Sequence, residues 1–381
     1  MRINFILPTP SMAGGIRVVA IYADELARRG HEVCLISPPP RQPVFVEKFK
    51  SWVKGAGWRR AQVQLQSHLD GLELNHRVLE TWRPIVDQDV PDGDVVIATW
   101  WETAEWVSRL GAKKGAKVYF IQHHEVFPYL LPRSRDTYRL PLHKIVVAKW
   151  LKDIMINEYG DRNVDIVPNS VDHSQFFAPV RRKQRIPTAG FLYATTPFKG
   201  ADLSIAALQI VAKRIASLRC ISFGSEPISR SLPLPNGTEY VLNPAQDQIR
   251  NLYAECDVWV TASRTEGFNL PAMEAMACRT PVVSTRTGWP AESIKSGWNG
   301  ALVEIEDLAG LADGVESVLS SAEEHWQRLS LNAHSTVASS SWKRSTDLFE
   351  QALERICRRA SRNEKGDQGD LEEESHEERT A

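Results

Sequence analysis

The sequence lacks several features that mark secreted, membrane-spanning and disulfide-rich proteins. Its five cysteines are scattered without a C-x-x-C pair, and their odd number argues against a disulfide framework. The longest apolar runs have the length of a strand, so none is long enough to cross a bilayer. The first residues, MRINFIL, fit a buried strand better than the apolar region of a signal peptide. These absences predict a cytoplasmic protein with reduced cysteines.

Charge of one sign and clustered metal ligands are also scarce. The formal net charge is −1 and no nucleic-acid-binding motif is present, so nucleic acid is not expected as a partner. The triplet Asp92-Gly93-Asp94 has the D-x-D form of a metal-binding motif. It precedes the strand predicted at residues 95–99, whereas a metal-binding triplet would follow one, so we interpret it as a solvated turn. We expect no metal and no cofactor.

Strand and helix patterns alternate along the chain in two series. At the N-terminus a strand, a Gly14-Gly15 turn, a helix over residues 16–29 and a strand at 32–37 form a βαβ unit. The first series continues with strands predicted at residues 95–99, 117–121, 144–148 and 164–167. The second series has strands predicted at residues 189–194, 218–223, 257–262, 281–284 and 300–303.

This alternation predicts an α/β fold of two Rossmann-like domains, in which ligands bind at the carboxyl ends of the strands. We assign residues 1–175 to an N-terminal domain and residues 176–340 to a C-terminal domain. An apolar stripe predicts a helix at 341–360 that packs back toward the N-terminal domain. The acidic stretch 361–381 has little to bury and is predicted to be disordered.

The stretch TEGFNLPAMEAMACRTPVVS, residues 265–284, combines two carboxylates with a predicted helix start. Pro271 suits the first helical position, so the N–H groups around it are free to bind a diphosphate. Glu274 is predicted in the first turn, where a carboxylate is favourable beside the helix dipole. The alternative is that Glu274 accepts hydrogen bonds from a ribose diol while Glu266 faces the sugar end of the same ligand. Spacing alone leaves both interpretations open.

The longer stretch SRTEGFNLPAMEAMACRTPVVSTRTGWPAE resembles the E-x7-E region of family 4 retaining glycosyltransferases. The resemblance extends to PTPSMAGGIRVVAIYADELARRGHEVCLIS, to VPNSVDHSQFF and to FKGADLSIAAL. It implies the GT-B fold, in which an N-terminal acceptor domain and a C-terminal donor domain face each other across a cleft. It also implies transfer of a sugar from a nucleotide-sugar donor with retention of configuration, the leaving phosphate taking the acceptor's proton.

The resemblance also implies roles for individual residues. Glu274 would hold the nucleotide ribose, Glu266 the hydroxyl groups of the donor sugar, and Lys199 the diphosphate. The remaining donor-binding candidates are Gly15, whose backbone would face the phosphates, and Gly267, Phe268, Asn269 and Leu270 around the helix start.

Some positions depart from the family pattern. The family usually has an arginine a few residues before its lysine, but Ala194 stands near that place. The candidates that would substitute for it are Thr195, Thr196, Arg17 and Arg264. Trp289 stands where a second glycine is usual, and Ser170 replaces a glycine. These two departures bear on the conformation of the loops more than on the activity.

His123 and His124 follow the strand predicted at residues 117–121. One of them matches the histidine that family members direct at the donor sugar, although a lone histidine is more often structural. With Lys199 and Glu266 they complete the catalytic candidates. The stretches ATWWETAEWV and YFIQHHEVFPY resemble a subgroup that includes rhamnosyltransferases of bacterial surface polysaccharides.

The stretch EKFKSWVKGAGWRRAQV, residues 47–63, interleaves basic and aromatic residues. One interpretation is peripheral binding to an anionic membrane surface at the inner face of the plasma membrane, because many relatives glycosylate lipid-linked acceptors. The other is a solvated helix whose tryptophans pack inward or line the acceptor cleft.

Two other classes of function were weighed against a transferase that acts on a glycan or lipid-linked acceptor. A dinucleotide-dependent oxidoreductase is poorly supported, because AGGIRV lacks the full G-x-G-x-x-G and no acidic residue ends the second strand. A non-catalytic scaffold that binds nucleotide sugars in a polysaccharide assembly is supported only by the missing arginine.

Overall fold

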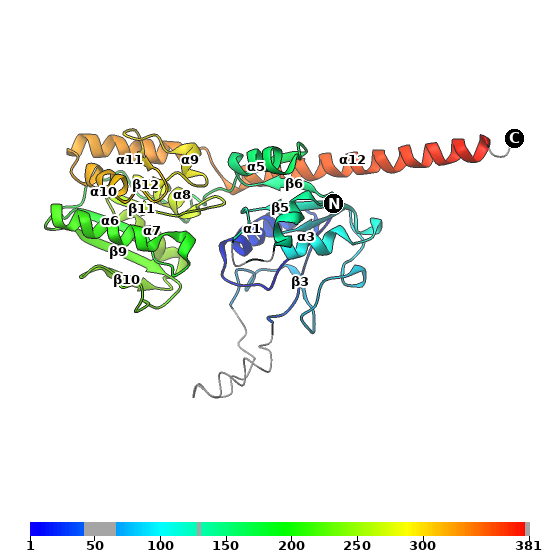
Figure 1. The fold of residues 1–381 in the computed structure, drawn as a ribbon, viewed down its shortest axis with the longest axis horizontal. Helices are drawn as coiled ribbons and strands as arrows, with labels where there is room; N and C mark the ends of the chain where they lie inside the picture. Colours follow the sequence, from blue (N-terminus) through cyan, green and yellow to red (C-terminus); the bar gives the residue numbers. More distant parts are fainter. Residues whose placement is uncertain (42–65, 128–129, 131, 378–381) are drawn as a thin grey trace, which may run out of the picture. The chain divides into compact units, whose positions relative to one another are not determined.

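The computed structural model of the chain describes residues 1–41, 66–127, 130 and 132–377, and side chains up to residue 362. The chain divides into two compact units (Figure 1). Unit 1 consists of Met1–Val146, Leu151–Val167 and the chain from Thr346 onward, and unit 2 consists of Val147–Trp150 and Pro168–Ser345. The domain limits predicted from the sequence stay predictions beside this division.

Unit 1 is built on a parallel sheet with the strand order β3-β2-β1-β4-β5-β6-β7. In register, Phe5 of β1 lies between Leu35 of β2 and Ile97 of β4. Apart from the exposed first residues Arg2 and Glu32, these inner strands are buried, as a parallel sheet covered on both faces requires. The strands are β1 (Arg2–Ile6), β2 (Glu32–Ser37), β3 (Asn75–Val78), β4 (Val95–Ala98), β5 (Ala116–Ile121), β6 (His143–Val146) and β7 (Val164–Ile166).

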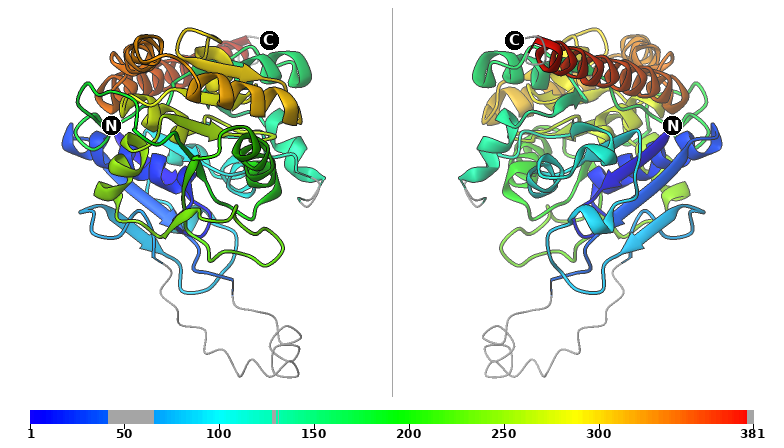
Figure 2. Two further views of the ribbon diagram at one scale, coloured as in Figure 1. Left: turned by 90° about the vertical axis from the view of Figure 1, so that its left-hand side faces the viewer. Right: turned by 90° about the vertical axis from the view of Figure 1, so that its right-hand side faces the viewer.

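Aromatic side chains pack α1 and α12 onto this sheet. Phe349 of α12 stacks on Tyr22 of α1 at 4.6 Å and meets Phe120 of β5 edge-on at 5.2 Å. Figure 2 shows α12, in red, running beside the blue first strands. The helices that carry residues of unit 1 are α1 (Gly14–Arg28), α3 (Trp101–Ser108), α4 (Arg133–Asp136), α5 (Lys149–Tyr159) and α12 (Trp342–Glu377).

Unit 2 is built on a second parallel sheet, with the order β10-β9-β8-β11-β12-β13. Side chains alternate along β11: Val258 and Val260 join the core formed with α6 and α10. Trp259 points the other way and packs edge-on against Tyr253 of α7 at 4.6 Å. The strands are β8 (Thr188–Leu192), β9 (Arg219–Gly224), β10 (Glu239–Leu242), β11 (Val258–Thr261), β12 (Val282–Thr285) and β13 (Gly300–Val303). The helices are α6 (Ala201–Arg214), α7 (Gln246–Ala254), α8 (Leu270–Ala277), α9 (Pro290–Ser293), α10 (Leu308–Leu319) and α11 (Glu323–Val337).

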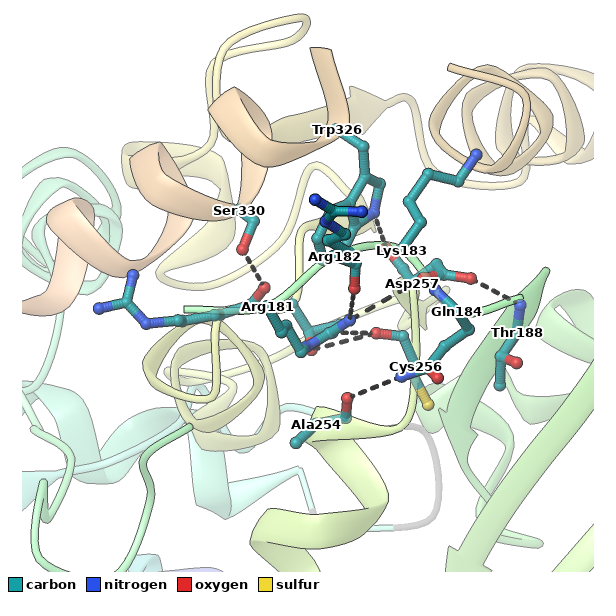
Figure 3. A network of polar contacts seen from close by, with 12 residues as sticks. Arg181, Arg182, Lys183, Gln184, Thr188, Ala254, Cys256, Asp257, Trp326 and Ser330 are labelled. Atoms are coloured by element: carbon teal, nitrogen blue, oxygen red, sulfur yellow. Dashed lines mark hydrogen bonds and ion pairs between the residues drawn. The ribbon is translucent and has the colours of Figure 1, made fainter. Parts of the chain in front are cut away.

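A buried polar network anchors the chain where it enters the sheet of unit 2 (Figure 3). The carboxylate of Asp257, just before β11, accepts from the N–H groups of Gln184 at 2.8 Å and Thr188 at 3.0 Å. Arg181 lies 3.9 Å from this carboxylate and over the ring of Trp326 at 4.6 Å. Burial raises the pKa of Asp257, yet its oxygens have partners. The network lies at the amino end of β11, opposite the carboxyl ends of the strands, where open α/β sheets generally bind ligands.

Both sheets are parallel and both pack helices, so the predicted class of two Rossmann-like α/β domains is confirmed. The edge strands β3 and β10 were not predicted. The expected Gly14-Gly15 turn is wrong, because α1 begins at Gly14 with Ala13 as its N-cap. The helix α12 continues to Glu377, into the stretch 361–381 for which disorder stays a prediction.

Candidate active site

The loop after β8 places Lys199 at the carboxyl end of that strand. It forms the 3-10 turn η4 (Pro197–Lys199), in which the N–H of Lys199 donates to the Thr196 carbonyl at 3.0 Å. The next residue, Gly200, has φ +63°, and a Cβ there would lie 1.9 Å from the carbonyl oxygen of Ala262. Only glycine fits this contact without displacing the backbone. The loop is therefore pressed against the end of β11, which fixes the base of the Lys199 side chain.

Lys199 and Glu266 meet as an ion pair. The Nζ of Lys199 lies 2.9 Å from Oε1 and 3.0 Å from Oε2 of Glu266, and Ser263 donates its hydroxyl to Oε1 at 2.9 Å. The Glu266 side chain is 8% exposed, whereas that of Lys199 is 32% exposed. A carboxylate so far from water needs a nearby cation, and Lys199 supplies it. The fold thus brings one cation and one anion together where β8 and β11 end.

Two tryptophans hold the loop that follows Glu266. Trp150 donates its indole N–H to the Gly267 carbonyl at 2.9 Å, and the backbone N–H of Trp289 donates to the Phe268 carbonyl at 2.8 Å. The rings of Phe268 and Trp289 are stacked at 5.8 Å. Trp289 has φ −60°, which any residue adopts, so this position does not require the glycine that is usual in the family. The tryptophan instead gives the loop a stacking partner.

Asn269 caps α8, which begins at Leu270. Its backbone is left-handed, with φ +79°, and its Oδ1 accepts from the N–H of Ala272 at 3.3 Å. Its Nδ2 donates to the Thr261 hydroxyl at 2.9 Å, which ties the cap to the end of β11. The first turn of α8 holds no acidic residue, so the prediction that Glu274 lies there is wrong. The helix starts one residue earlier than Pro271 suggested, which moves Glu274 into the second turn.

That correction weakens the purely electrostatic interpretation of Glu274. The effect of a helix dipole falls off within its first turn, so a carboxylate in the second turn gains little from it. Glu274 is 5% exposed, and Tyr253 of α7 donates its hydroxyl to Oε2 at 3.0 Å. Sequence reasoning missed both Tyr253 and Ser263. Ser263 lies three residues before Glu266, so its closeness in the sequence was a signal that could have predicted the contact. Tyr253 reaches the site only through the packing of α7 against α8.

Two of the residues considered as substitutes for the missing arginine contact carboxylates in the structure. Thr195 donates its N–H, at 3.3 Å, and its hydroxyl to Oε2 of Glu226. Arg264 binds Asp202 through two nitrogens, at 2.8 and 2.9 Å, and also contacts Glu306. Hydrogen bonds to these two carboxylates raise the pKa of Arg264. Binding of a diphosphate by Arg264 would require those bonds to break.

Four predicted site residues belong to unit 1, of which Gly15 and Arg17 lie in the first turn of α1. The Gly15 carbonyl accepts from Nε2 of Gln122 at 3.0 Å, and the Arg17 N–H donates to the Ala13 carbonyl at 3.2 Å. The other two, the histidines, follow β5 at its carboxyl end. Gln122 lies between β5 and the histidines, so its bond to Gly15 joins the start of α1 to the histidine turn.

The two histidines have different surroundings. The ring of His124 lies against Tyr138 at 5.1 Å and Tyr159 at 5.7 Å, and its Nε2 is 2.7 Å from the Tyr159 hydroxyl. Burial lowers the pKa of His124 to about 4. His123 contacts Phe127 at 4.9 Å, and its Nδ1 lies 3.0 Å from the His124 carbonyl oxygen. The His124 ring is therefore engaged by tyrosines of unit 1 and is kept neutral by burial. His123 is the better catalytic candidate of the two.

Both carboxylates of the D-x-D triplet have basic or backbone partners. Asp92 accepts from Lys114 at 2.8 Å, and Asp94 accepts from the N–H of Arg2 at 2.7 Å. Within the described part of the chain, no three His, Cys, Asp or Glu side chains are grouped to hold a metal ion. No helix in that part is long and apolar enough to span a membrane. The basic stretch 47–63 lies outside the described residues.

A cavity of about 510 Å³ opens in unit 1 at the amino ends of β6 and β7, lined by residues 138–144, 159–161 and 163. Buried Lys144 pairs there with Asp161 at 2.6 Å and donates to a backbone carbonyl at 2.7 Å. Since this ion pair is satisfied within the protein, we interpret it as structural. The residues with the predicted chemistry lie at the carboxyl ends of the strands, and the candidate site is placed there.

Both halves of the chain match family models of sugar-transferring enzymes. Residues 12–175 match the model described as Glycosyltransferase Family 4, and residues 183–321 match the model described as Glycosyl transferases group 1. Each model matches less than half of the chain, and the two matches together take in most of it, so the chain resembles these glycosyltransferase families in both halves. The second match contains Lys199, Glu266 and Glu274, and the first contains both histidines.

Curated relatives align over parts of the chain. The D-inositol 3-phosphate glycosyltransferase of Mycolicibacterium smegmatis is 26% identical over 201 residues, which cover 48% of this chain and 45% of the relative. The N-acetyl-alpha-D-glucosaminyl L-malate synthase of Bacillus anthracis is 39% identical over 80 residues, 21% of each chain. The chain thus spans less than half the length of these relatives in the aligned regions.

Several solved structures resemble the chain in fold over most of its length. HepE of Anabaena, in complex with UDP and glucose, has a TM-score of 0.68 at 16% identity, covering 93% of this chain and 100% of that one. Sucrose-phosphate synthase from Thermosynechococcus elongatus has a TM-score of 0.70 at 15% identity, covering 93% and 99%. S. aureus TarM, in complex with Fondaparinux, alpha-GlcNAc-glycerol and UDP, has a TM-score of 0.69 at 11% identity, covering 93% and 100%. At these identities the likeness establishes the fold alone.

Proposed function

We propose that the chain is a retaining, metal-independent hexosyl- or deoxyhexosyltransferase. It moves a sugar from a nucleotide-sugar donor to a glycan or lipid-linked acceptor in the synthesis of cell-surface polysaccharide or glycolipid. The observation that carries the proposal is the Lys199–Glu266 pair, in which residues 67 positions apart meet at 2.9 Å where β8 and β11 end. A cation for a diphosphate and an anion for sugar hydroxyls are what a nucleotide sugar needs side by side.

The proposed chemistry follows from the charge that develops on the leaving group. As the bond to the sugar breaks, negative charge grows on the diphosphate, and Lys199 with the N–H groups at the start of α8 stabilises it. Glu266 orients the sugar hydroxyls, and Glu274, held by Tyr253, accepts from the ribose diol. The acceptor attacks from the face that the diphosphate leaves, and its proton passes to the departing phosphate oxygen.

The wider context of the reaction rests on the relatives and on the sequence. Structures of HepE and TarM hold UDP, which supports a nucleoside diphosphate as the leaving group here. Two stretches, ATWWETAEWV and YFIQHHEVFPY, resemble a subgroup that includes rhamnosyltransferases. This resemblance supports testing nucleotide-activated deoxyhexoses such as rhamnose as donors. The basic and aromatic stretch 47–63 supports a cytoplasmic enzyme that binds peripherally to anionic membranes.

The first experiment is a thermal-shift panel of UDP, GDP, TDP and ADP and their sugar conjugates. A ligand at a hundredfold excess over its Kd stabilises the native state by about 2.7 kcal/mol. We expect one nucleotide to stabilise the wild type and to lose most of that effect in Glu274→Gln, which retains the size of the side chain. Glu324→Gln, an exposed change on α11, is the control. If no nucleotide stabilises the wild type, the proposal fails.

The alternative is a scaffold that binds nucleotide sugars without turnover. It is favoured by Ala194 in place of the usual arginine and by the engagement of Arg264 with Asp202 and Glu306. Product formation from the stabilising donor separates the two functions. Transfer that is lost in Glu266→Gln while nucleotide binding persists supports the enzyme, whereas binding without transfer in the wild type supports the scaffold.

A further inference from the structure

The hydrogen bond made by His123 determines which of its ring nitrogens carries the hydrogen. Nδ1 lies 3.0 Å from the backbone carbonyl oxygen of His124. A carbonyl oxygen only accepts, so Nδ1 must donate and must carry the hydrogen. In the neutral ring the lone pair then belongs to Nε2. Any group that meets this nitrogen has to be a hydrogen-bond donor, and a sugar hydroxyl is such a group.

The carbonyl that selects this tautomer is itself held in place. It also accepts from the N–H of Val126 at 3.0 Å, so both of its lone-pair directions are used. The turn around it is clamped by one hydroxyl: Tyr138 accepts from the N–H of Glu125 at 2.6 Å and donates to the His123 carbonyl at 3.2 Å. Tyr138 has no exposed surface, and its ring stacks on Tyr119 at 5.7 Å. The hydroxyl that holds the turn is therefore shielded from water.

A second bond fixes the far side of the same turn. The Glu125 side chain is buried, and its Oε2 accepts from the N–H of Trp101 at 3.1 Å. Trp101 is the first residue of α3, so the carboxyl group ties the histidine turn to the start of that helix. Neither Tyr138 nor Glu125 has a role in the chemistry described above. Both hold the turn from which His123 projects.

We propose that Tyr138 is a positioning residue that sets His123 as its Nδ1–H tautomer, so that Nε2 accepts a hydrogen bond from a hydroxyl of the bound sugar. The role toward the sugar rests on the proposed glycosyltransferase function, whereas the tautomer is a property of the protein alone. Losing the Tyr138 hydroxyl removes one hydrogen bond from the His123 carbonyl and one from the Glu125 N–H, lets the turn shift, and weakens the selection of Nδ1–H.

The tautomer is measured on the full chain labelled with [15N]histidine. Two-bond proton–nitrogen correlations at about pH 8, above the ordinary titration range of histidine, distinguish protonated from lone-pair nitrogens. His123→Gln and His124→Gln assign the two signals. We expect the wild type to show Nδ1 protonated and Nε2 unprotonated at His123. The opposite pattern in the wild type overturns the proposal without any variant.

Tyr138→Phe keeps the ring and removes the hydroxyl. Tyr193→Phe in unit 2 is the matched control, because its buried hydroxyl likewise accepts from one backbone N–H and donates to one backbone carbonyl. We expect Tyr138→Phe to convert His123 to a mixture of tautomers and to lower kcat on the order of tenfold with a smaller change in the donor KM. Tyr193→Phe should leave the tautomer unchanged. Equal spectra and kinetics in the two variants would rule out a positioning role for Tyr138.

A conservative replacement tests what Nε2 does. His123→Gln retains an acceptor oxygen near the place of Nε2, whereas His123→Leu has none. We expect the glutamine variant to keep measurably more transfer activity, and equal losses in both contradict an acceptor role. If the proteins show the tautomer but transfer no sugar, the proposed function fails while the assignment of Nδ1–H stands.

Discussion

At the scale of single residues, two hydrogen-bond donors proposed to bind the diphosphate already donate to carboxylates of the protein. Lys199 meets Glu266, and Thr195 directs both its N–H and its hydroxyl at Glu226. A diphosphate that binds at Thr195 must replace the Glu226 carboxylate, which is an anion like itself. The hydrogen bonds between Thr195 and Glu226 therefore make the free energy of diphosphate binding slightly less favourable.

We predict that Glu226→Gln tightens binding of the nucleoside diphosphate. The change removes a negative charge and weakens the competing acceptor, and a surface interaction of this kind is worth up to about 1 kcal/mol, or about fivefold in Kd. Isothermal titration of UDP, or of whichever nucleotide the panel selects, measures the effect. Glu324→Gln controls for net charge. Unchanged affinity in Glu226→Gln would show that Thr195 does not contact the phosphates.

His124 predicts a pH dependence of stability. Burial lowers the pKa of His124 to about 4 in the folded protein. In the unfolded chain the same ring binds a proton at its ordinary pKa of about 6.5. The stability contributed by the neutral ring is complete above about pH 6.5 and is lost progressively as the pH falls toward about 4. We expect this contribution to reach about 1–3 kcal/mol.

Urea unfolding of the wild type and of His124→Phe at several pH values between about 7 and 4 measures this contribution. The wild type should lose stability more steeply than the variant, because phenylalanine binds no proton in either state. Acidic and basic groups distant from His124 affect both proteins alike, so the difference in slope belongs to position 124 and to the groups coupled to it, Glu158, His123 and Arg135. Parallel curves would mean that His124 titrates normally in the folded chain.

At the scale of elements, the sequence predicts the buried strands well but misses two of the four edge strands of the two sheets. Central strands such as β4 are continuous apolar runs, which sequence patterns identify directly. The two strands that were missed, β3 (NHRV) and β10 (EYVL), are edge strands whose residues are mostly exposed or half-buried. With little apolar surface to bury, they have no periodic signal, and pairing with a neighbour is what makes them strands.

The tight contact at Gly200 leads to a prediction for η4 and the start of α6. In Gly200→Ala the new Cβ would meet the Ala262 carbonyl oxygen at 1.9 Å in a left-handed backbone. We expect a loss of about 3 kcal/mol or more in the free energy of unfolding, and weaker nucleotide binding because Lys199 is displaced.

Gly237→Ala is the matched control, since Gly237 also has a positive φ, +78°, but nothing lies within 4 Å of its Cβ position. It should cost only about 1 kcal/mol, from the left-handed backbone alone. Chemical unfolding of both variants, with nucleotide titration, gives the comparison. Similar costs for the two would mean that the backbone at Gly200 relaxes easily.

At the scale of the whole molecule, the resemblance predicts roles for Lys199, Glu266 and Glu274, but the residues that hold them in place are set by tertiary packing. Trp150 reaches Gly267 from a four-residue segment, Val147–Trp150, that belongs to unit 2 although its flanks belong to unit 1. No local pattern contains such a contact, because it depends on how distant elements fold together. The position of Glu274 in α8 was mistaken for the same reason: the cap that starts the helix uses the Thr261 hydroxyl of β11.

The last prediction concerns how the end of the chain stabilises its beginning. Phe349 of α12 has no exposed surface and touches Phe5, Tyr22 and Phe120, so Phe349→Ala leaves a cavity among three aromatic rings. We expect it to lower the free energy of unfolding of unit 1 by about 3–5 kcal/mol. The neighbouring Leu348 is 37% exposed on the same helix, and Leu348→Ala should cost less than about 1 kcal/mol.

Amide hydrogen exchange in β1 and β5 measures the effect locally, because these strands carry Phe5 and Phe120. Protection there should fall by about two to four orders of magnitude in Phe349→Ala, which corresponds to the expected loss of free energy. It should change little in Leu348→Ala. If both variants leave exchange in these strands unaltered, α12 contributes nothing to unit 1 and its aromatic contacts do not stabilise the sheet.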